Sequence, residues 1–201
     1  MIAAPWDLIL TLTFAATGLL CVLGLVQDRP TGADGTLSDE ALIHVGHLVM
    51  SIAMILMVWV MVDDVVTWAQ VAIFAIAAAS LAPAFARSES VAQRTDLIGH
   101  VVFHAAMIWM LAAMPLLMAG APVSGEGGGH HHHAEAGAGP ALTATPAWAD
   151  GVNLVFVALS AAAAGWWLVG MFRGSARHRI HLGCFSLMGA GMAVMLVVMN
   201  V

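Results

Sequence analysis

Long uninterrupted runs of apolar residues fill most of the chain, and short polar connections separate them. A helix needs about 20 mostly apolar residues to cross the roughly 30 Å hydrocarbon core of a bilayer. Six segments meet this requirement; they span residues 5–27, 41–62, 65–86, 97–119, 148–171 and 181–200. Because these runs are continuous and lack the alternation of barrel strands, the sequence predicts an all-α integral membrane protein with six transmembrane helices.

The composition agrees with this prediction and leaves no room for a large soluble domain. Of the 201 residues, 61% are hydrophobic and only 9% are charged, which excludes a water-soluble globular fold. We therefore expect a single six-helix membrane domain over residues 1–201. The chain opens without the basic residues of a secretory signal, so the first helix is expected to be retained. Pro83 and Pro115 are expected to interrupt the third and fourth helices.

The connection between the fourth and fifth segments is long. Residues 120–146 are rich in Gly, Ala and Pro and contain four consecutive histidines, His130–His133. This composition predicts a flexible loop. We interpret its histidine run as a tract that attracts metal ions.

The six basic side chains of the chain are all arginines, and they occupy only the first, third and fifth connections. They are Arg29, Arg87, Arg94, Arg173, Arg177 and Arg179. Alternate connections lie on the same side of a membrane, and the positive-inside rule assigns the arginine-bearing side to the cytoplasm. The sequence thus predicts a multi-pass protein of the plasma (inner) membrane. Its six helices form three hairpins, with the N-terminus, the C-terminus and the 120–146 loop outside.

Histidines and methionines recur at steps of three and four in the second, fourth and sixth segments, which places them on one face of each helix. The second segment carries His44, His47, Met50, Met54, Met57 and Met61. The fourth carries His100, His104, Met107, Met110, Met114 and Met118, and the sixth carries His178, His181, Cys184, Met188, Met192, Met195 and Met199. Twelve of the 14 methionines belong to these stripes. All three stripes have their histidines at the cytoplasmic end, so they can face a common axis.

The ligand chemistry of the stripes indicates copper. Thioether sulfur is a soft, neutral ligand that suits Cu(I), and neutral imidazole also binds copper. Repeated weak sites could pass a monovalent cation along the membrane without adding charge to the bilayer. The sequence therefore predicts a copper-binding membrane protein for Cu(I) transport, storage or delivery, with the histidines, the methionines and Cys184 as metal ligands. Cys21 is expected to be a buried small residue.

Two other interpretations of the stripes stay open. Methionine is an adaptable apolar filler, so each one could simply pack the helices together. The histidines weigh against this, because ionisable residues within membrane spans are rare and usually functional. A b-type haem electron carrier would use His47 with His104, or His100 with His181, as axial ligands. His178, in the run Arg-His-Arg-Ile-His, also fits a solvated basic loop.

Several functional classes lack their motifs in this chain. It has no glycine-rich phosphate loop, no nucleophile with a base and orienting acid, and no paired carboxylates within a span, so hydrolytic and nucleotide-dependent activities are not expected. The expected partner is the lipid bilayer, and no nucleic-acid partner is expected. A further hypothesis makes the chain a non-catalytic subunit of a membrane complex, such as a copper membrane monooxygenase or a respiratory complex.

Two histidine motifs carry a family resemblance. The run His-Val-Gly-His-Leu-Val-Met-Ser-Ile-Ala-Met, from His44, and the run His-Val-Val-Phe-His-Ala-Ala-Met, from His100, resemble an actinobacterial family of small multi-pass membrane proteins of unknown function. A looser similarity is to Ctr-type copper transporters, whose membrane methionines and inner His or Cys ligands follow the same order. Those proteins have three spans per chain and form trimers, so this similarity is one of ligand chemistry.

Overall fold

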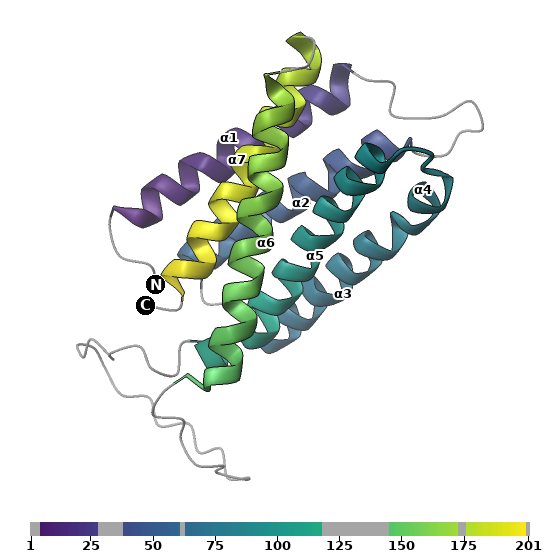
Figure 1. Cartoon of the computed structure of the whole chain (residues 1–201). Coiled ribbons are helices and arrows are strands. Elements are labelled where there is room, and N and C mark those ends of the chain that lie inside the picture. Colours follow the sequence, from purple (N-terminus) through teal and green to yellow (C-terminus); the bar gives the residue numbers. More distant parts are fainter. Residues whose placement is uncertain (1–4, 28–37, 61–62, 118–144, 173–175, 200–201) are drawn as a thin grey trace, which may run out of the picture.

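The computed structural model describes residues 5–27, 38–60, 63–117, 145–172 and 176–199. These residues form seven helices and no strand (Figure 1). The helices are α1 (Trp6–Gln27), α2 (Asp39–Trp59), α3 (Asp64–Ser80), α4 (Ala82–Arg87), α5 (Val91–Leu117), α6 (Ala147–Met171) and α7 (Ala176–Val198). With α3 and α4 taken as one span, six segments are long and apolar enough to cross a membrane. The predicted all-helical architecture with six candidate spans is confirmed.

The third span is broken where proline was expected to interrupt it. Leu81 ends α3 and starts α4, and its amide donates to the carbonyl of Ala78 in a tight last turn. Pro83 has no amide proton to donate to the carbonyl of the preceding turn, so the helix cannot continue regularly through this point. The expected interruption at Pro115 was wrong, because α5 continues through this residue as far as Leu117.

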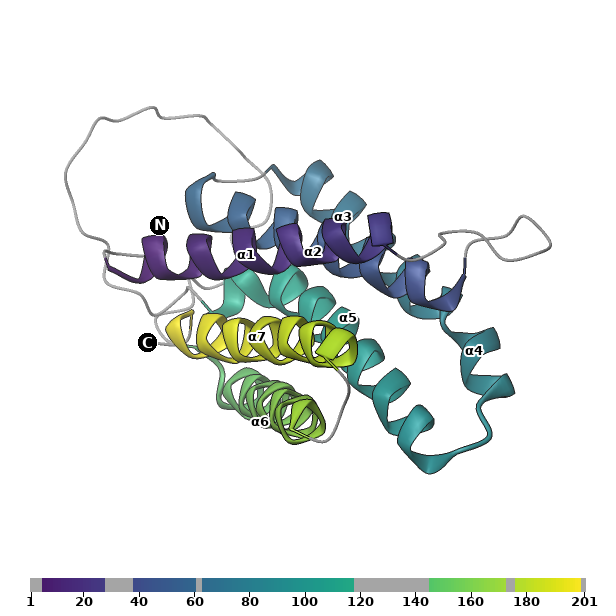
Figure 2. The same ribbon diagram turned by 90° about the horizontal axis from the view of Figure 1, so that it is seen from above.

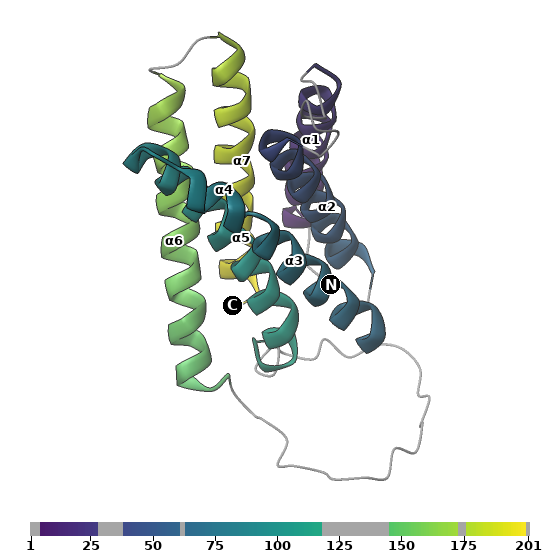
Figure 3. The ribbon, with the colours of Figure 1, turned by 90° about the vertical axis from the view of Figure 1, so that its right-hand side faces the viewer.

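The helices pack as three antiparallel hairpins. They pair α1 with α2, α3 with α5, and α6 with α7; α1 also packs on α7, and α5 on α6. Figures 2 and 3 show this arrangement from two further directions. The first residues of α2, α5 and α7 lie at one end of the bundle, together with Arg87, Arg94 and Arg179. We call this end the arginine end.

The bundle exposes many large apolar side chains and buries several polar ones. The side chains of His44, His47, His100 and His104 are at most 3% exposed, whereas apolar residues such as Leu12 and Ile76 are about 70% exposed. Apolar surfaces of this kind suit contact with lipid, and buried polar groups are then held away from it. The pattern fits a multi-pass membrane protein.

Methionines fill the middle of the bundle. Those of α2, α5 and α7 meet in one buried cluster with large aromatic side chains such as Phe14 and Phe103. The methionines of this cluster are Met50, Met54, Met57, Met107, Met110, Met188, Met192 and Met195. We call these eight residues the methionine core. The three stripes therefore do face one interior.

Candidate functional site

Two histidine pairs connect the three stripe-bearing helices. Nε2 of His47 in α2 lies 2.8 Å from Nδ1 of His100 in α5, and Nε2 of His44 in α2 lies 3.1 Å from Nδ1 of His181 in α7. Both distances are those of hydrogen bonds, so in each pair an N–H of one ring donates a hydrogen bond to a nitrogen of the other. Helix α2 supplies one partner to each pair because His44 and His47 are three residues apart on one face.

His104 adds a nitrogen with a fixed role. Its Nδ1 lies 2.7 Å from the backbone carbonyl oxygen of His100, which can only accept, so Nδ1 carries the proton and donates. Its Nε2 then keeps a lone pair, and this buried atom has no hydrogen-bond partner among the described residues. A histidine that donates one ring N–H to a carbonyl and presents the other nitrogen is oriented as metal-ligating histidines usually are.

A second such nitrogen is Nδ1 of His47, which also has no hydrogen-bond partner among the residues that the structure describes. The preceding residue, Gly46, faces His104: a Cβ atom at Gly46 would lie 3.0 Å from Nε2 of His104. The absence of a side chain at Gly46 lets α5 bring this nitrogen close to α2. Two buried nitrogens without partners thus occur on neighbouring faces of α2 and α5.

Aromatic rings hold the histidines in place. The Phe185 ring stacks on the His47 ring, with 4.9 Å between the ring centroids. It meets the His100 ring edge-on, with a centroid distance of 4.8 Å. His100 also stacks on Trp167, with 5.0 Å between the ring centroids. The Trp167 indole N–H donates to Asp96 at 3.2 Å, and the Trp166 indole N–H donates to the same carboxylate oxygen at 2.9 Å. Asp96 therefore anchors the ring against which His100 packs.

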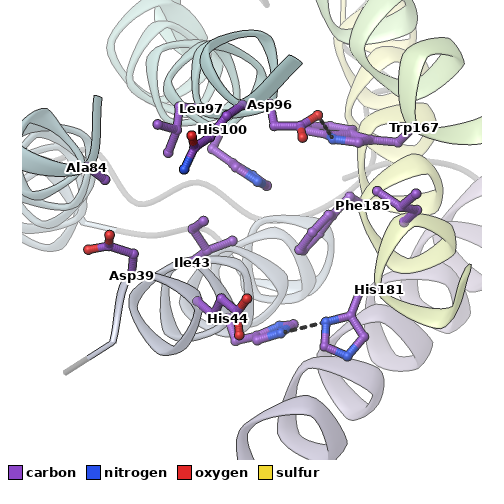
Figure 4. A pocket seen from close by; sticks show the side chains of 13 residues that line it. Asp39, Ile43, His44, Ala84, Asp96, Leu97, His100, Trp167, His181 and Phe185 are labelled. Carbon is purple, nitrogen blue, oxygen red and sulfur yellow. Dashed lines mark hydrogen bonds between the residues drawn. The ribbon is translucent and has the colours of Figure 1, made fainter. Parts of the chain in front are cut away.

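A cavity at the arginine end lies between the helices that carry the histidines (Figure 4). Its volume is about 250 Å³, and its walls come from α2, α4, α5, α6 and α7. His44, His100 and His181 lie in its lining, which also contains three acidic residues. These are Asp39, Glu40 and Asp96. We call this cavity the acidic vestibule.

The sequence places acidic residues at this mouth for a local reason. Ser38 caps α2 by accepting a hydrogen bond from the amide of Ala41, and the next two residues, Asp39 and Glu40, complement the positive end of the helix dipole. Asp39 also accepts two hydrogen bonds of 2.9 Å from Arg87 at the end of α4. The Arg87–Asp39 ion pair thus joins two hairpins at the rim of the vestibule. Glu40 and Asp96 add further negative charge beside the histidines.

A thiol pair lies beside the histidines. Sγ of Cys21 in α1 is 3.5 Å from Sγ of Cys184 in α7, and both thiols are free and buried. Cys184 lies one helical turn from His181. The structure therefore places a second sulfur atom, that of Cys21, beside the predicted ligand Cys184.

A match over most of the chain shows the family to which it belongs. The sequence profile of a domain of unknown function, DUF5134, matches residues 39–199. The chain belongs to the DUF5134 family. No curated protein and no solved structure matches it. The part of this DUF5134 protein covered by the match runs from α2 to α7, so α1 and Cys21 lie outside it.

Most of the predicted ligands of the DUF5134 chain come together. The histidines of α2 and α5, His181, Cys184 and the methionine core lie inside one bundle, whereas Met114 is only partly buried. The side chain of His178, the run His130–His133 and most of the 120–146 loop lie outside the described residues, as do Met61 and Met118. In the described part of the chain, no three His, Cys, Asp or Glu side chains cluster as a ready metal site.

The histidine partners differ from those named for haem. The haem hypothesis paired His47 with His104 and His100 with His181, whereas the hydrogen-bonded pairs join His47 to His100 and His44 to His181. Periodicity gives each residue a face on its own helix, but it does not give the rotation of one helix against another.

Asp96, Phe185 and Trp167 were not identified as site residues from the sequence, although the first two had a local signal. Asp96 lies four residues before His100, and Phe185 lies four residues after His181, so both share a face with a histidine. Trp167 had no such signal, because it comes from α6, which carries no histidine stripe.

Proposed function

We propose that this DUF5134 protein binds monovalent copper inside the membrane, at buried histidines between the acidic vestibule and the methionine core. The observation that carries the proposal is the meeting of histidines from α2, α5 and α7 at the floor of the vestibule and at the edge of that core. A cation entering from the acidic rim would meet imidazole nitrogens first and thioether sulfurs next.

The unpaired nitrogens supply the first ligands. His104 presents a lone pair at Nε2, and His47 presents an unpaired Nδ1. Leaving a buried polar atom without a partner costs about 1–3 kcal/mol, which a metal bond would offset. Cu(I) accepts soft and neutral ligands, and its single charge is the least costly metal charge to hold away from water.

The charge pattern supports a direction of access. By the positive-inside rule, the arginines at the arginine end support a cytoplasmic location for that end, with both chain termini outside the plasma (inner) membrane. The acidic vestibule would then open to the cytoplasm and exchange copper with it. Its carboxylates raise the local concentration of cations at the mouth.

Copper(I) titration tests this proposal. The full-length protein in mild detergent would be titrated anaerobically with Cu(I) against a chromogenic Cu(I) chelator. The test variant replaces both members of a pair, His47→Leu with His100→Leu, so that neither ring is left without its partner. Asn153→Leu is the matched control, because Asn153 is equally buried and hydrogen-bonded but belongs to α6, away from the histidines.

We expect the wild type to bind copper, the histidine variant to lose at least one copper per chain, and the Asn153 variant to bind as the wild type does. Equal binding by the wild type and the histidine variant, or no binding by either, would refute the proposal. Size-exclusion profiles of the three proteins verify that the variants fold.

A further inference from the structure

Cys21 and Cys184 form a two-sulfur constellation between α1 and α7. Their Sγ atoms are 3.5 Å apart, and both side chains are at most 2% exposed. Cys184 also donates to the carbonyl of Thr17 at 3.5 Å, so Cys21 is the donor in the contact between the two sulfurs. Helix packing alone does not require two thiols to face each other, since any small residue would fill these positions.

The thiol pair continues the row of histidines. Cys184 lies three residues beyond His181 in α7, and Cys21 lies three residues before Gly24 in α1. Gly24 faces the other member of the same histidine pair, because a Cβ atom there would lie 2.9 Å from Nε2 of His44. The thiols therefore occupy the next helical turn on the same two faces. Four residues beyond Cys184, Met188 belongs to the methionine core.

From this geometry we infer that Cys21 and Cys184 form a soft-metal site that binds one Cu⁺ between the histidine pair and the methionine core. This inference rests on the proposed function, and it assigns to that function its tightest site. Thiolate is a stronger ligand for Cu(I) than thioether, and two sulfurs from different helices are already in contact.

Charge balance favours a monovalent ion at this position. One thiol proton leaves, Cu⁺ takes its place on that sulfur, and the second thiol coordinates as a neutral ligand. The oxidation states of copper and sulfur do not change, and the net charge of the buried site stays zero. A divalent ion would require both thiols to lose protons, or would leave a net charge in a region where unpaired charge is costly.

The sulfur separation fits a bent site. With metal–sulfur bonds of about 2.3 Å, as in zinc sites, two sulfurs 3.5 Å apart subtend an angle of about 100° at the metal. That angle leaves room for a third ligand. The His44–His181 pair lies one helical turn away along α7.

The test compares the wild type with a Cys21→Ala, Cys184→Ala double variant by anaerobic Cu(I) titration of the full chain. Ser51→Ala is the matched control, since Ser51 is a buried small residue that hydrogen-bonds Thr17 beside the thiols. We expect the double variant to bind one Cu(I) fewer per chain and to lose the ultraviolet absorption of a Cu(I)–thiolate bond. The Ser51 variant should keep both. Equal stoichiometry in all three proteins, without that absorption, overturns the inference.

A measurement on the wild type keeps the inference testable if the double variant does not fold. In weakly buffered solution, filling the thiol site should release one proton per Cu(I), because the histidine and methionine ligands are neutral before and after binding. A titration with no proton release overturns the inference.

The histidine and cysteine variants separate the two proposals. Thiolate absorption that persists in the His47→Leu, His100→Leu protein with its copper stoichiometry unchanged would refute the histidine site and keep the thiol site. Copper lost from that histidine variant, but fully retained in the cysteine variant, would refute the thiol site and keep the histidine site.

Discussion

The rings of His47 and His100 meet at 2.8 Å between Nε2 and Nδ1, although α2 packs mainly on α1, and α5 mainly on α3 and α6. The contact spans the interior of the bundle, and Phe185 from α7 stacks against it. A polar bridge between two hairpins in an apolar interior is specific, because either ring alone would be left without a partner.

We expect this bridge to stabilise the fold measurably. His47→Leu or His100→Leu alone should lower the free energy of unfolding by about 1–3 kcal/mol, since each leaves a buried ring nitrogen unpaired. The double variant should lose less than the sum of the two, by about 0.6–1.7 kcal/mol, as for hydrogen bonds between membrane helices. Detergent-induced unfolding would measure the free energy of unfolding of the wild type, the two single variants and the double variant. Additive effects would show that the rings do not interact.

Gly24 is expected to be indispensable for the His44–His181 pair. Gly24→Ala places a Cβ atom 2.9 Å from Nε2 of His44, so the ring must move and the unfolding free energy should fall by about 1–3 kcal/mol. Gly165→Ala is the matched control, because a Cβ atom at Gly165 meets nothing within 4 Å. In a helix this control should gain about 0.5–1 kcal/mol. Thermal unfolding in detergent would compare the stabilities of the two variants. Similar stabilities would contradict the close contact between Gly24 and the His44 ring.

The acidic vestibule should speed copper binding. Glu40→Gln with Asp96→Asn removes two negative charges and keeps a carbonyl acceptor for the Trp166 and Trp167 indoles. We expect Cu(I) to associate about tenfold more slowly at low salt, with the copper stoichiometry unchanged. Stopped-flow measurements at low salt and at about 1 M salt check this, because screening should remove most of the difference.

Asp150→Asn is the control for this effect, since Asp150 lies in the first turn of α6, at the other end of the bundle. An equal slowing in the Asp150 variant would mean that net charge acts, and not the vestibule.

Substitutions in the methionine core should distinguish a packing role of these residues from a role as copper ligands. Met54→Leu, Met107→Leu and Met188→Leu conserve volume, so each should cost less than about 1.5 kcal/mol of stability. Without thioether sulfur we expect the triple variant to lose Cu(I) binding beyond the histidines and thiols. Met171→Leu in α6 is the control, because Met171 packs only at the margin of the core. Unchanged copper stoichiometry in the triple variant would mean that these methionines serve packing alone.

The spans and the stripes could be predicted because they are local properties. Apolar length fixes each span, and a step of three or four residues fixes a shared face, so α2, α5 and α7 were predicted together with their histidine and methionine stripes. The break before Pro83 followed from the missing amide proton. These features need no knowledge of any other helix.

The pairing of residues could not be predicted, because it depends on how the helices rotate and tilt against one another. His47 could have met His104 or His100, and only the packed bundle selects His100. Cys21 lies 163 residues from Cys184, and no periodicity links them. Trp167 joins the site from α6 only because Gly99 in α5 leaves space, where a Cβ atom would lie 2.8 Å from the Trp167 ring.

The most direct test of the central claim is elemental analysis of the full-length protein. The protein would be purified anaerobically in mild detergent without a metal-affinity step, beside the His47→Leu, His100→Leu variant. We predict copper in the wild type at one or more atoms per chain, and a clear loss of copper in the variant. Stoichiometric iron in place of copper, or wild type and variant with equal copper, would contradict the account.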